Sequence, residues 1–400
     1  MKCIILAAGE GKRMHPLTYT RPKVMLPLGN KPVLELNLVN AIKAGLNEFI
    51  FVVGYKSEMV RRYFKNGSKW DVKIEYVNQG KPEGTAHAIG VTEKFVDEDF
   101  LVFCGDTVFG IDDIKKIKEI NNSIGLYSVD NPGEYGIVKT QNGRLVKIFE
   151  KMKNPFSNLI NAGIYHFKPS IYDYIKNTSK SRRGEYEITD TINMFEEKMY
   201  SVELKEWFDI GYPWHLLKAN KKILEENKSV VEGKVEENAT LHGKIQIGEN
   251  TIVKNGSYIE GPVIIGKDCK IGPNCYIRPY TSIGDGCHVG NASEVKNSII
   301  LNNTNIPHHN YVGDSVIGEN CNLGSGTKIA NLRLDEKNIA ATVNGEKVDT
   351  KRRKLGAIIG DHVETGINSM MNPGTIVGNN VFVGPGRIAK GEIKKGSFLV

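Results

Sequence analysis

Residues 247–301 read IGENTIVKNGSYIEGPVIIGKDCKIGPNCYIRPYTSIGDGCHVGNASEVKNSIIL, and every sixth residue of this stretch is aliphatic. The column consists of Ile247, Val253, Ile259, Ile265, Ile271, Ile277, Ile283, Val289, Val295 and Leu301. Glycine often follows the aliphatic residue, and a small residue such as Thr251 or Cys269 often stands four places after it. A period of six fits neither a helix nor a simple alternating strand, but it fits short strands separated by tight corners. The stretch therefore predicts a β-helix of stacked coils with a continuous aliphatic ladder inside.

The hexad pattern extends beyond this stretch. It runs from about residue 235 to Ile329, with one-residue slips expected around Ile306 and Ile317. Residues 331–357 interrupt the pattern, after which it resumes. An interruption of this length is either a disordered insertion or a functional arm.

Length and charge bound the class of protein. Four hundred residues with 40% hydrophobic content can form two or three domains with real cores. The net charge of +7 is spread along the chain, apart from the basic run Lys351–Lys354. This distribution favours anionic small molecules over nucleic acid as binding partners.

The six cysteines show no zinc-binding spacing. Four of them, Cys269, Cys275, Cys287 and Cys321, fall in or in phase with the small-residue column, so we interpret them as small core residues. Such cysteines indicate a reducing compartment. The chain has no apolar run of eighteen residues, and its apolar N-terminal stretch is too short for a signal peptide. We therefore expect a cytoplasmic protein without membrane contact.

The first part of the chain alternates buried-strand patterns with helical ones. Apolar runs predict strands at 3–8, 49–53, 100–104, 123–129 and 160–167, and helical patterns lie at 33–44, 57–64 and 214–227. This alternation indicates a Rossmann-like α/β domain with a mainly parallel sheet, whose ligands would bind at the carboxyl ends of the strands. Helix-forming residues give way to Gly, Asn, Ile and Val after Lys228, so we expect two domains, at 1–228 and 235–400.

The first predicted strand leads into a glycine-rich, basic loop. Residues 6–27 read LAAGEGKRMHPLTYTRPKVMLP. The backbone N–H groups of such a loop can bind phosphate, because glycine lets the main chain approach closely. The pair Gly9 and Gly11 alone is a weak signal, since neither the dinucleotide fingerprint nor the P-loop spacing is present.

As a whole, this segment closely resembles the signature of sugar-1-phosphate nucleotidylyltransferases, which join a nucleoside triphosphate to a sugar 1-phosphate and release pyrophosphate. The resemblance implies that Arg13 holds the β- and γ-phosphates and that Lys23 holds the reacting phosphates. Positioned cations and a divalent metal suit this reaction, because negative charge builds up on the phosphate oxygens in the transition state.

Two aspartates are the candidate ligands of Mg²⁺. Asp106 follows an apolar strand in the sequence FCGD, where a carboxylate without a partner is costly. Asp209 lies in WFDIGYP. An aspartate after a strand is more often a turn or helix-cap residue. Both nevertheless match the metal-binding aspartates of the family, and Mg²⁺ prefers carboxylates combined with water and phosphate oxygens.

The same resemblance implies the substrate contacts. Gln79 in NQGKPEGT resembles the glutamine that binds the pyrimidine edge in uridylyl- and thymidylyltransferases, so UTP or dTTP is the expected nucleotide. The other implied nucleotide- and sugar-binding residues are Leu6, Ala7, Ala8, Gly9, Gly11, Gly84, Thr85, Gly105, Gly136, Glu150 and Asn161. The usual Glu-Lys-Pro motif is here Glu150-Lys151-Met152, and the surroundings of Asp209 look more like those of thymidylyltransferases. The choice between U and T therefore stays open.

Two adjacent histidines stand in the segment Pro307–Asp314, PHHNYVGD, at a predicted slip of the repeat. Acetylation of an amino group needs a base of near-neutral pKa that takes the proton as the amine attacks a thioester, and histidine suits this role. His308 is the candidate base and His309 its rival. We interpret His15 and His87 as helper or surface residues.

The spacing around His308 resembles that of bifunctional glucosamine-1-phosphate acetyltransferase/N-acetylglucosamine-1-phosphate uridylyltransferases and their archaeal-type relatives. In that family the base precedes a tyrosine by 3 residues, an asparagine by 23 and a lysine by 29, which here are Tyr311, Asn331 and Lys337. The resemblance implies a left-handed β-helix, a homotrimer or dimer of trimers, and acetyl-CoA as co-substrate. It also implies acetyl-acceptor contacts at Arg278, Lys296, Tyr311 and Asn322, acetyl-CoA contacts at Ser325 and Asn331, and a catalytic contribution from Lys337.

The interruption at 331–357 begins with Asn331 and carries Lys337, so we expect it to be an arm that closes the acetyl site against a neighbouring subunit. The basic run Lys351–Lys354 is more often a solvated face than a contact for the phosphates of coenzyme A.

Together these patterns predict a bifunctional enzyme that makes UDP- or dTDP-activated hexosamines. One alternative is a monofunctional glucose-1-phosphate nucleotidylyltransferase whose β-helix is only a scaffold. Another is a non-enzymatic regulatory assembly subunit, although such subunits usually lack the residues that correspond to Lys23, Asp106 and Asp209.

Overall fold

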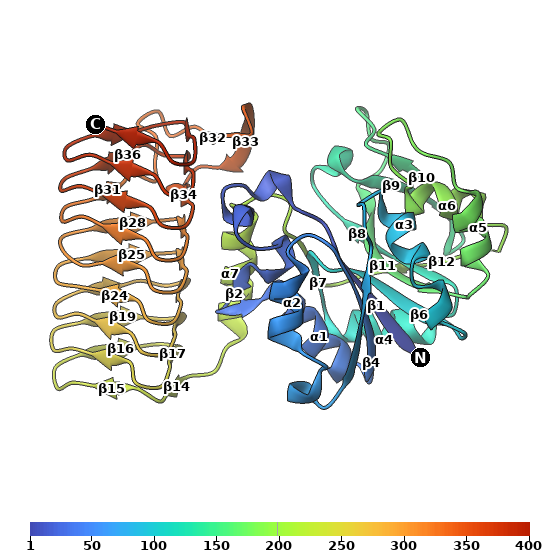
Figure 1. Cartoon of the computed structure of the whole chain (residues 1–400), viewed down its shortest axis with the longest axis horizontal. Coiled ribbons are helices and arrows are strands. Elements are labelled where there is room, and N and C mark those ends of the chain that lie inside the picture. The colour runs from blue at the N-terminus through green and yellow to red at the C-terminus, as the bar shows by residue number, and fades with distance from the viewer. Residues whose placement is uncertain (198) are drawn as a thin grey trace. The chain divides into compact units, whose positions relative to one another are not determined.

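A computed structural model describes residues 1–197 and 199–400 of the chain. The described residues form two compact units (Figure 1). The first consists of Met1–Glu10, Pro22–Met25 and Pro32–Asp209, and the second of Gly11–Arg21, Leu26–Lys31 and Ile210–Val400. The sequence limits of 1–228 and 235–400 for two domains remain a prediction. Within the described residues, no helix is both long enough and apolar enough to cross a membrane.

The first unit is built on a nine-stranded sheet. In spatial order its strands are β5 (Lys73–Asn78), β4 (Glu48–Val53), β1 (Lys2–Ala7), β6 (Phe100–Cys104), β11 (Leu159–Phe167), β8 (Ser123–Ser128), β12 (Tyr200–Glu203), β10 (Arg144–Glu150) and β9 (Gly136–Gln141). Strands β5, β4, β1 and β6 are parallel. Strand β11 runs antiparallel to both β6 and β8, so the expected parallel arrangement holds in one half of the sheet and the other half is mixed.

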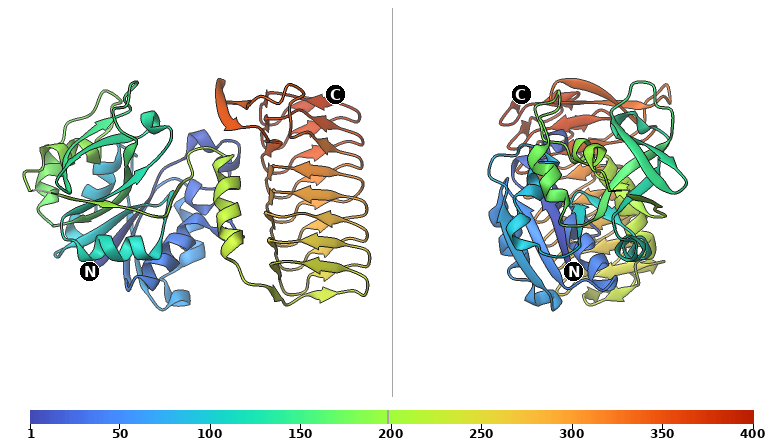
Figure 2. Two further views of the ribbon diagram at one scale, coloured as in Figure 1. Left: turned by 180° about the vertical axis from the view of Figure 1, so that it is seen from behind. Right: turned by 90° about the vertical axis from the view of Figure 1, so that its right-hand side faces the viewer.

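Helices cover both faces of this sheet (Figure 2). One face carries α1 (Val33–Lys43), α2 (Ser57–Phe64) and α4 (Ile111–Glu119), and the other carries α3 (Thr85–Gly90), α5 (Ile171–Asn177) and α6 (Ile188–Met194). Successive side chains of a strand point to opposite faces, and accordingly Cys3 and Ile5 of β1 belong to one hydrophobic cluster and Ile4 to the other. The predicted α/β class is confirmed.

Most of the second unit is a β-helix of three parallel sheets, whose stacked coils are seen in Figures 1 and 2. The first sheet consists of β14 (Val230–Val231), β17 (Ile245–Ile247), β20 (Val263–Ile265), β23 (Thr281–Ile283), β26 (Ile299–Ile300), β29 (Val316–Ile317), β34 (Ala357–Ile359), β37 (Thr375–Val377) and β40 (Glu392–Ile393). The second consists of β15 (Lys234–Val235), β18 (Ile252–Val253), β21 (Lys270–Ile271), β24 (His288–Val289), β27 (Asn305–Ile306), β30 (Asn322–Leu323), β35 (Glu364–Thr365), β38 (Phe382–Val383) and β41 (Phe398–Leu399). The third consists of β16 (Thr240–His242), β19 (Tyr258–Glu260), β22 (Tyr276–Ile277), β25 (Glu294–Lys296), β28 (Tyr311–Gly313), β31 (Lys328–Ile329), β36 (Met370–Met371) and β39 (Ile388–Ala389).

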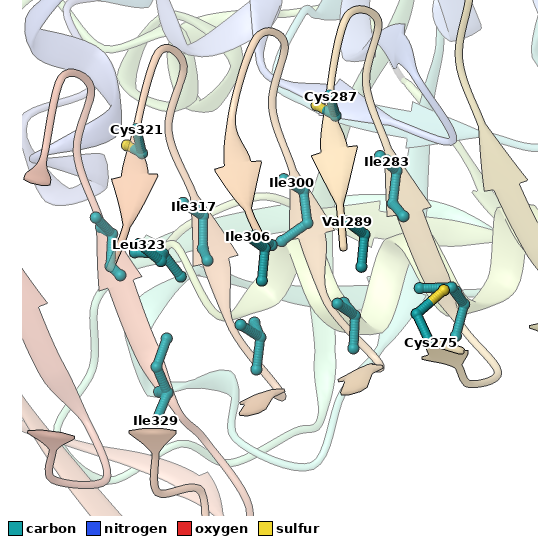
Figure 3. Packing of buried hydrophobic residues seen from close by; sticks show 14 of the residues in the cluster. Cys275, Ile283, Cys287, Val289, Ile300, Ile306, Ile317, Cys321, Leu323 and Ile329 are labelled. Atoms are coloured by element: carbon teal, nitrogen blue, oxygen red, sulfur yellow. The ribbon is translucent and has the colours of Figure 1, made fainter. Parts of the chain in front are cut away.

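An aliphatic ladder fills the interior of these coils, as Figure 3 shows for its central part. The predicted column from Ile247 to Val295 lies entirely within one buried cluster. Equivalent residues pair across neighbouring parallel strands, as Ile265 does with Ile283. Burial of one aliphatic side chain contributes roughly 1.5–3 kcal/mol, so the ladder is a major source of the stability of this unit.

The last predicted member of the column, Leu301, is not part of this ladder, and the prediction there is wrong. Ile300 holds the interior position instead and pairs with Ile283 and Ile317, each seventeen residues away. In the preceding coil, Ile283 pairs with Ile265, eighteen residues before it. Two successive coils are therefore one residue shorter than the hexad pattern requires.

The missing residues are lost at the corners that lead from the third sheet to the first. These corners are 296–299 and 313–316, because each of them places one residue fewer between consecutive interior side chains. The predicted slip at Ile306 is therefore wrong, since Ile306 and Val312 are separated by a full hexad. His308 accordingly lies on a corner of normal length.

The small-residue column also faces inward. Cys269, Cys275, Cys287 and Cys321 are buried in the same cluster as the ladder, and all of them are free thiols. Their interpretation as small core residues is confirmed.

The interruption of the repeat is an ordered arm. Strands β32 (Ile339–Val343) and β33 (Glu346–Arg352) form an antiparallel hairpin that leaves the stack of coils (Figure 1). A bridge between Leu332 and Lys354 closes its base. The disordered alternative is therefore wrong, and the closing of the acetyl site by this arm stays a prediction.

Helix α7 (His215–Glu226) and two early segments of the chain pack on the outside of the first β-helix sheet. The Oδ1 atom of Asn220 accepts hydrogen bonds from the Ser282 hydroxyl and from the Gly29 N–H, both at 2.8 Å. Arg21, which is 4% exposed, forms an ion pair of 2.6 Å with the buried Asp361. Segment 11–21 is thus anchored on the coils of the same unit.

Candidate active sites

The two predicted metal ligands come together in the first unit. Asp106 lies in the two-residue turn between β6 and β7 (Thr107–Phe109). The pairing of β7 with β13 (Trp207–Asp209) places Asp209 opposite Thr107. Burial raises the pKa of the Cys104 thiol, and the charges of both aspartates raise it further, which places the two carboxylates near the same sulfur atom. The Tyr135 hydroxyl donates a hydrogen bond of 3.1 Å to Asp209 Oδ2.

This pair of carboxylates fits a magnesium ion. No group of three or more His, Cys, Asp or Glu side chains that suits a metal occurs in the described part of the chain. Asp106 and Asp209 would supply two hard oxygen ligands, and Mg²⁺ characteristically completes its shell with waters and substrate phosphates.

Lys23 lies beside the metal candidates. It is only 8% exposed, and its Nζ atom is 2.6 Å from Asp106 Oδ2. The neighbouring Gly105 donates its N–H to the Leu6 carbonyl at 3.0 Å. A β-carbon on Gly105 would lie 2.5 Å from that oxygen, so only glycine allows the ends of β1 and β6 to approach this closely.

The phosphate loop begins where β1 ends. Ala7 and Ala8 are buried, whereas Gly9 is exposed, and a β-carbon added to it would meet no atom within 4 Å, so its backbone faces open space. Gly11 has a left-handed φ of 71° that favours glycine. The guanidinium group of Arg13 lies 5.4 Å from the centre of the Tyr212 ring, which holds this side chain in a cation–π contact.

Gln79 is held in one orientation at the end of β5. Its Nε2 atom donates to the Gly84 carbonyl at 3.1 Å and lies 3.4 Å from Nδ1 of His87. A carbonyl can only accept, so the NH₂ group must face Gly84 and the Oε1 atom is left to bind a ligand donor. The N3–H group of uracil or thymine is such a donor.

The loop that follows Gln79 is fixed by close backbone packing. Gly84 has a φ of 115°, and a β-carbon there would lie 2.4 Å from the Tyr186 carbonyl. The Thr85 hydroxyl accepts the N–H of Ile188 at 2.9 Å. Both predicted residues therefore shape the loop through contacts with the start of α6.

The three predicted sugar-binding residues lie on neighbouring strands. Gly136 and Glu150 are directly paired between β9 and β10, and a β-carbon on Gly136 would lie 3.1 Å from Glu150 Oε1. Asn161 on β11 follows Ile160, which pairs with Ile137 of β9. The sheet thus brings together residues that are up to 25 positions apart in the sequence.

In the second unit, the predicted acetyl-acceptor residues Arg278, Lys296 and Tyr311 gather on the outside of the third sheet. Tyr311 on β28 occupies the position equivalent to Glu294 on β25 and Tyr276 on β22. Arg278 donates from Nη1 to Glu294 Oε1 at 2.8 Å. Lys296 lies on the strand next to it, two residues after Glu294.

Asp314 connects this group to the arm, although no sequence motif marked it as a site residue. Its buried carboxylate accepts hydrogen bonds from Asn297 at 2.6 Å and from Asn331 at 2.5 Å. Lys296 Nζ lies 4.0 Å from the same carboxylate. Burial lowers the pKa of Lys296, the cations Lys354 and Arg278 act in the same direction, and Asp314 and Glu294 oppose the shift.

Gly313 leaves room for the Tyr311 hydroxyl and the Asn331 amide to approach the backbone. A β-carbon on Gly313 would lie 2.7 Å from both the Tyr311 hydroxyl and Asn331 Nδ2. Burial, followed by the charges of Glu294 and Asp314, raises the pKa of Tyr311, so its hydroxyl stays protonated as a donor at neutral pH.

His308 belongs to a different group of predicted residues. Its side chain is exposed, and its carbonyl accepts the N–H of Gly326, next to Ser325, at 2.9 Å. Burial lowers the pKa of His288 most, and the charges of Lys254 and then His308 lower it further, so His308 lies near His288. Asn322 continues the column of His288 and Asn305 on the second sheet. Within the described residues, no hydrogen bond or ion pair joins the His308 ring to the group around Asp314.

Lys337 is not brought to either group in the described chain. It is exposed, and its N–H donates to Asp335 Oδ1 at 3.4 Å. The arm cations that do lie near Lys296 and Asp314 are instead Lys354 and Arg352. The sequence signal for them was the basic run Lys351–Lys354, which begins within β33 and which composition alone would place on a solvated face.

Three families match consecutive parts of the chain. The nucleotidyl transferase family matches residues 2–226, the GMPPB C-terminal domain matches residues 259–355, and the hexapeptide repeat of succinyl-transferase matches residues 356–387. The bifunctional protein GlmU of Methanococcus maripaludis is 42% identical over 100% of this chain and 97% of its own length. The bifunctional sugar-1-phosphate nucleotidylyltransferase/acetyltransferase of Sulfurisphaera tokodaii is 42% identical over 100% of both chains.

The chain belongs to this bifunctional GlmU-type family. It is therefore an enzyme with a nucleotidylyltransferase and an acetyltransferase activity. The match along the whole chain favours this conclusion over a monofunctional enzyme with a scaffold β-helix and over a regulatory subunit.

A solved structure also resembles part of this GlmU-type chain. A candidate glucose-1-phosphate thymidylyltransferase from Bacillus anthracis is 30% identical, with a TM-score of 0.53, over 57% of this chain and 98% of its own. Nearly all of that structure matches 57% of this chain.

Proposed function

We propose that this GlmU-type enzyme transfers an acetyl group from acetyl-CoA to an amino-sugar 1-phosphate, and a UMP or dTMP group from UTP or dTTP to a sugar 1-phosphate. The observation that carries the proposal is the presence of two separate polar groups in one chain. Lys23, Asp106 and Asp209 form the first, and Arg278 and Lys296 contribute to the second.

In the nucleotidylyl transfer, an oxygen of the sugar phosphate attacks the α-phosphorus of the nucleotide in line, and pyrophosphate leaves. Mg²⁺ held by Asp106 and Asp209 would neutralise charge on the phosphates. Lys23, which is paired with Asp106 in this structure, supplies a buried cation for the reacting phosphate oxygens. Arg13 binds the β- and γ-phosphates.

The choice of nucleotide rests on Gln79. Its fixed amide presents Oε1 to a donor, which suits the N3–H of uracil and thymine and does not suit cytosine, whose N3 atom is an acceptor. Gly136, Glu150 and Asn161 bind the sugar.

In the acetyl transfer, the amine of the sugar attacks the thioester carbon, the bond to the coenzyme A sulfur breaks, and the thiol leaves. His308 accepts the proton of the attacking amine. Arg278 and Lys296 bind the phosphate of the acceptor, and Tyr311 and Asn331 donate hydrogen bonds in the site. Asn322 contacts the acceptor, Ser325 contacts acetyl-CoA, and Lys337 assists from the arm.

We further propose a homotrimer or a dimer of trimers located in the cytoplasm. The separation of His308 from the group around Asp314 within one chain supports a site to which two copies contribute. Six free thiols support a reducing compartment. Size measurement in solution, before and after dilution, tests the assembly.

A matrix of substrates tests both activities. Glucose, glucosamine, galactosamine and N-acetylated 1-phosphates are each combined with UTP, dTTP and acetyl-CoA, and pyrophosphate and free thiol are measured. We expect pyrophosphate with UTP or dTTP and Mg²⁺, and free thiol only with the amino sugars. Absence of thiol release with every amino sugar would contradict the acetyltransferase proposal.

A further inference from the structure

A pocket of about 520 Å³ opens at the base of the arm. Its lining consists of Leu332, Arg352, Arg353 and Lys354. The bridge between Leu332 and Lys354 closes the arm at this point, so the pocket belongs to the ordered part of the insertion.

The three cations in the pocket differ in their partners. Arg353 is paired with Glu336 at 2.5 Å. Arg352 donates from Nε to the Lys354 carbonyl at 3.1 Å. Within residues 1–197 and 199–400, neither Arg352 nor Lys354 forms an ion pair with a carboxylate. A solvated basic face does not explain Arg352, because this side chain is only partly exposed.

The pocket continues the cation group of the acetyl site. Lys354 lies close enough to Lys296 to lower its pKa, as Arg278 also does. Burial lowers the pKa of Arg352, and the charge of Asp314 opposes this shift. Glu294 pairs with Arg278, and Asp314 is the carboxylate near Lys296 and Arg352. Four cations therefore face two carboxylates, and the excess positive charge favours binding of an anion.

We propose that Arg352 and Lys354 form a phosphate-binding pocket that extends the acetyl site beyond Arg278 and Lys296. This inference rests on the proposed acetyltransferase function. Its ligand is a phosphate ester, which is carried either by the amino-sugar 1-phosphate or by acetyl-CoA. The half-buried Arg352 and the exposed Lys354 suit phosphate, because charge-assisted hydrogen bonds to its oxygens are stronger than neutral ones.

The test compares each substrate with its counterpart that lacks a phosphate. The variants are Arg352→Gln and Lys354→Met, and the matched control is Lys351→Met, since Lys351 is exposed, is paired with Asp349 at 3.1 Å and does not line the pocket. The acceptors are glucosamine 1-phosphate and glucosamine, and the donors are acetyl-CoA and acetyl-3′-dephospho-CoA. KM is measured for each, and nucleotidylyl transfer in the same samples reports folding.

Loss of one charge-assisted contact should raise KM about tenfold for one phosphate-bearing substrate. A rise for glucosamine 1-phosphate but not glucosamine identifies the sugar phosphate as the ligand. A rise for acetyl-CoA but not for its dephospho form identifies the coenzyme phosphate. Unchanged KM values, or equal changes with and without the phosphate, would overturn the proposal.

Failure of the proposed activity is distinguishable from failure of the pocket. If the unmodified enzyme releases no thiol, the acetyltransferase proposal fails. Calorimetric titration with inorganic phosphate and with adenosine 3′,5′-bisphosphate then compares the unmodified chain with Lys354→Met. Weaker binding to the variant supports the pocket, and equal binding overturns it. The exposed Lys354 carries this test even if Arg352→Gln does not fold.

Discussion

The two candidate sites are assembled in different ways. In the α/β unit, predicted residues stand at or near strand ends, and pairing between strands brings them together. The two-stranded sheet of β7 and β13, for example, places Asp209 opposite Thr107, the neighbour of Asp106. In the β-helix, each coil adds one strand to each of three sheets. His308 lies at the corner between the second and third sheets, and Asp314 lies at the corner between the third and first sheets. His308 therefore lies apart from the group around Asp314 within one chain. Strand pairing can therefore bring all residues of a site together within one chain. The corners of a β-helix keep such residues apart, so one chain supplies only part of the site.

The sharpest test of the two-site division is Asp106→Asn. Loss of one metal-binding carboxylate should reduce nucleotidylyl transfer about 10³-fold, because the site depends on charge neutralisation at the phosphates. Acetyl transfer should remain unchanged. Pyrophosphate and thiol release are measured on one preparation, and a parallel loss of both activities would contradict independent sites.

His308→Ala makes the reciprocal test. Removal of the general base should lower acetyl transfer at least about 10²-fold, with nucleotidylyl transfer intact. His309→Ala is the matched control. His309 is also exposed, but its backbone has a left-handed φ of 53° at this corner. We expect little change in that variant. If His309→Ala caused the larger loss, the assignment of the base would be reversed.

Asp314→Asn tests whether this buried acid positions the phosphate-binding group. We expect KM for glucosamine 1-phosphate to rise about tenfold, with a smaller effect on acetyl-CoA. Lys296 binds phosphate in its charged form, so binding weakens as pH rises through its lowered pKa. Asp314 opposes that lowering, so the variant should lose affinity at a lower pH than the unmodified enzyme.

Asn297→Ala is the control for this variant, because it removes another hydrogen bond of Asp314 without removing the charge. An identical pH profile in Asp314→Asn and the unmodified enzyme would mean that Asp314 only stabilises the corner. The melting temperatures of both variants separate that structural effect from the change in KM.

The smallest expected effect concerns nucleotide choice. Gln79→Leu should raise KM for UTP and dTTP roughly fivefold to tenfold, because one hydrogen bond to the base is lost. The effect on kcat should be smaller, since the base is remote from the reacting phosphorus. Lys81→Ala, at an exposed position, is the control. Equal KM values in Gln79→Leu and the unmodified enzyme would remove Gln79 from base recognition.

Much of the fold was predictable because its periods are short. The six-residue spacing placed Ile247 through Val295 in the interior, and the four column cysteines were correctly interpreted as core residues. The error at Leu301 has a physical reason. An aliphatic residue also stands at position 300, so the pattern cannot show which of two neighbouring aliphatic residues turns inward at a shortened corner.

Some of the site residues could be predicted from the sequence, and others could not. Motif resemblance identified Lys23 and Asp106, which the structure brings to 2.6 Å. It did not identify Asp314 or Arg352, because their importance depends on a contact between a coil corner and the returning strand of the arm. For Lys337 the family spacing indicated a role, and the described chain places it in an exposed segment without regular structure.

By itself, the sequence determined the class of each domain, the interior of the coils and the individual residues suited to each reaction, since these depend on local period and side-chain chemistry. Only the tertiary structure decided where the repeat is shortened and which side chains share a site. Hydrogen bonds to a buried carboxylate such as Asp314 join residues from different coils, and no local pattern records which coils become neighbours.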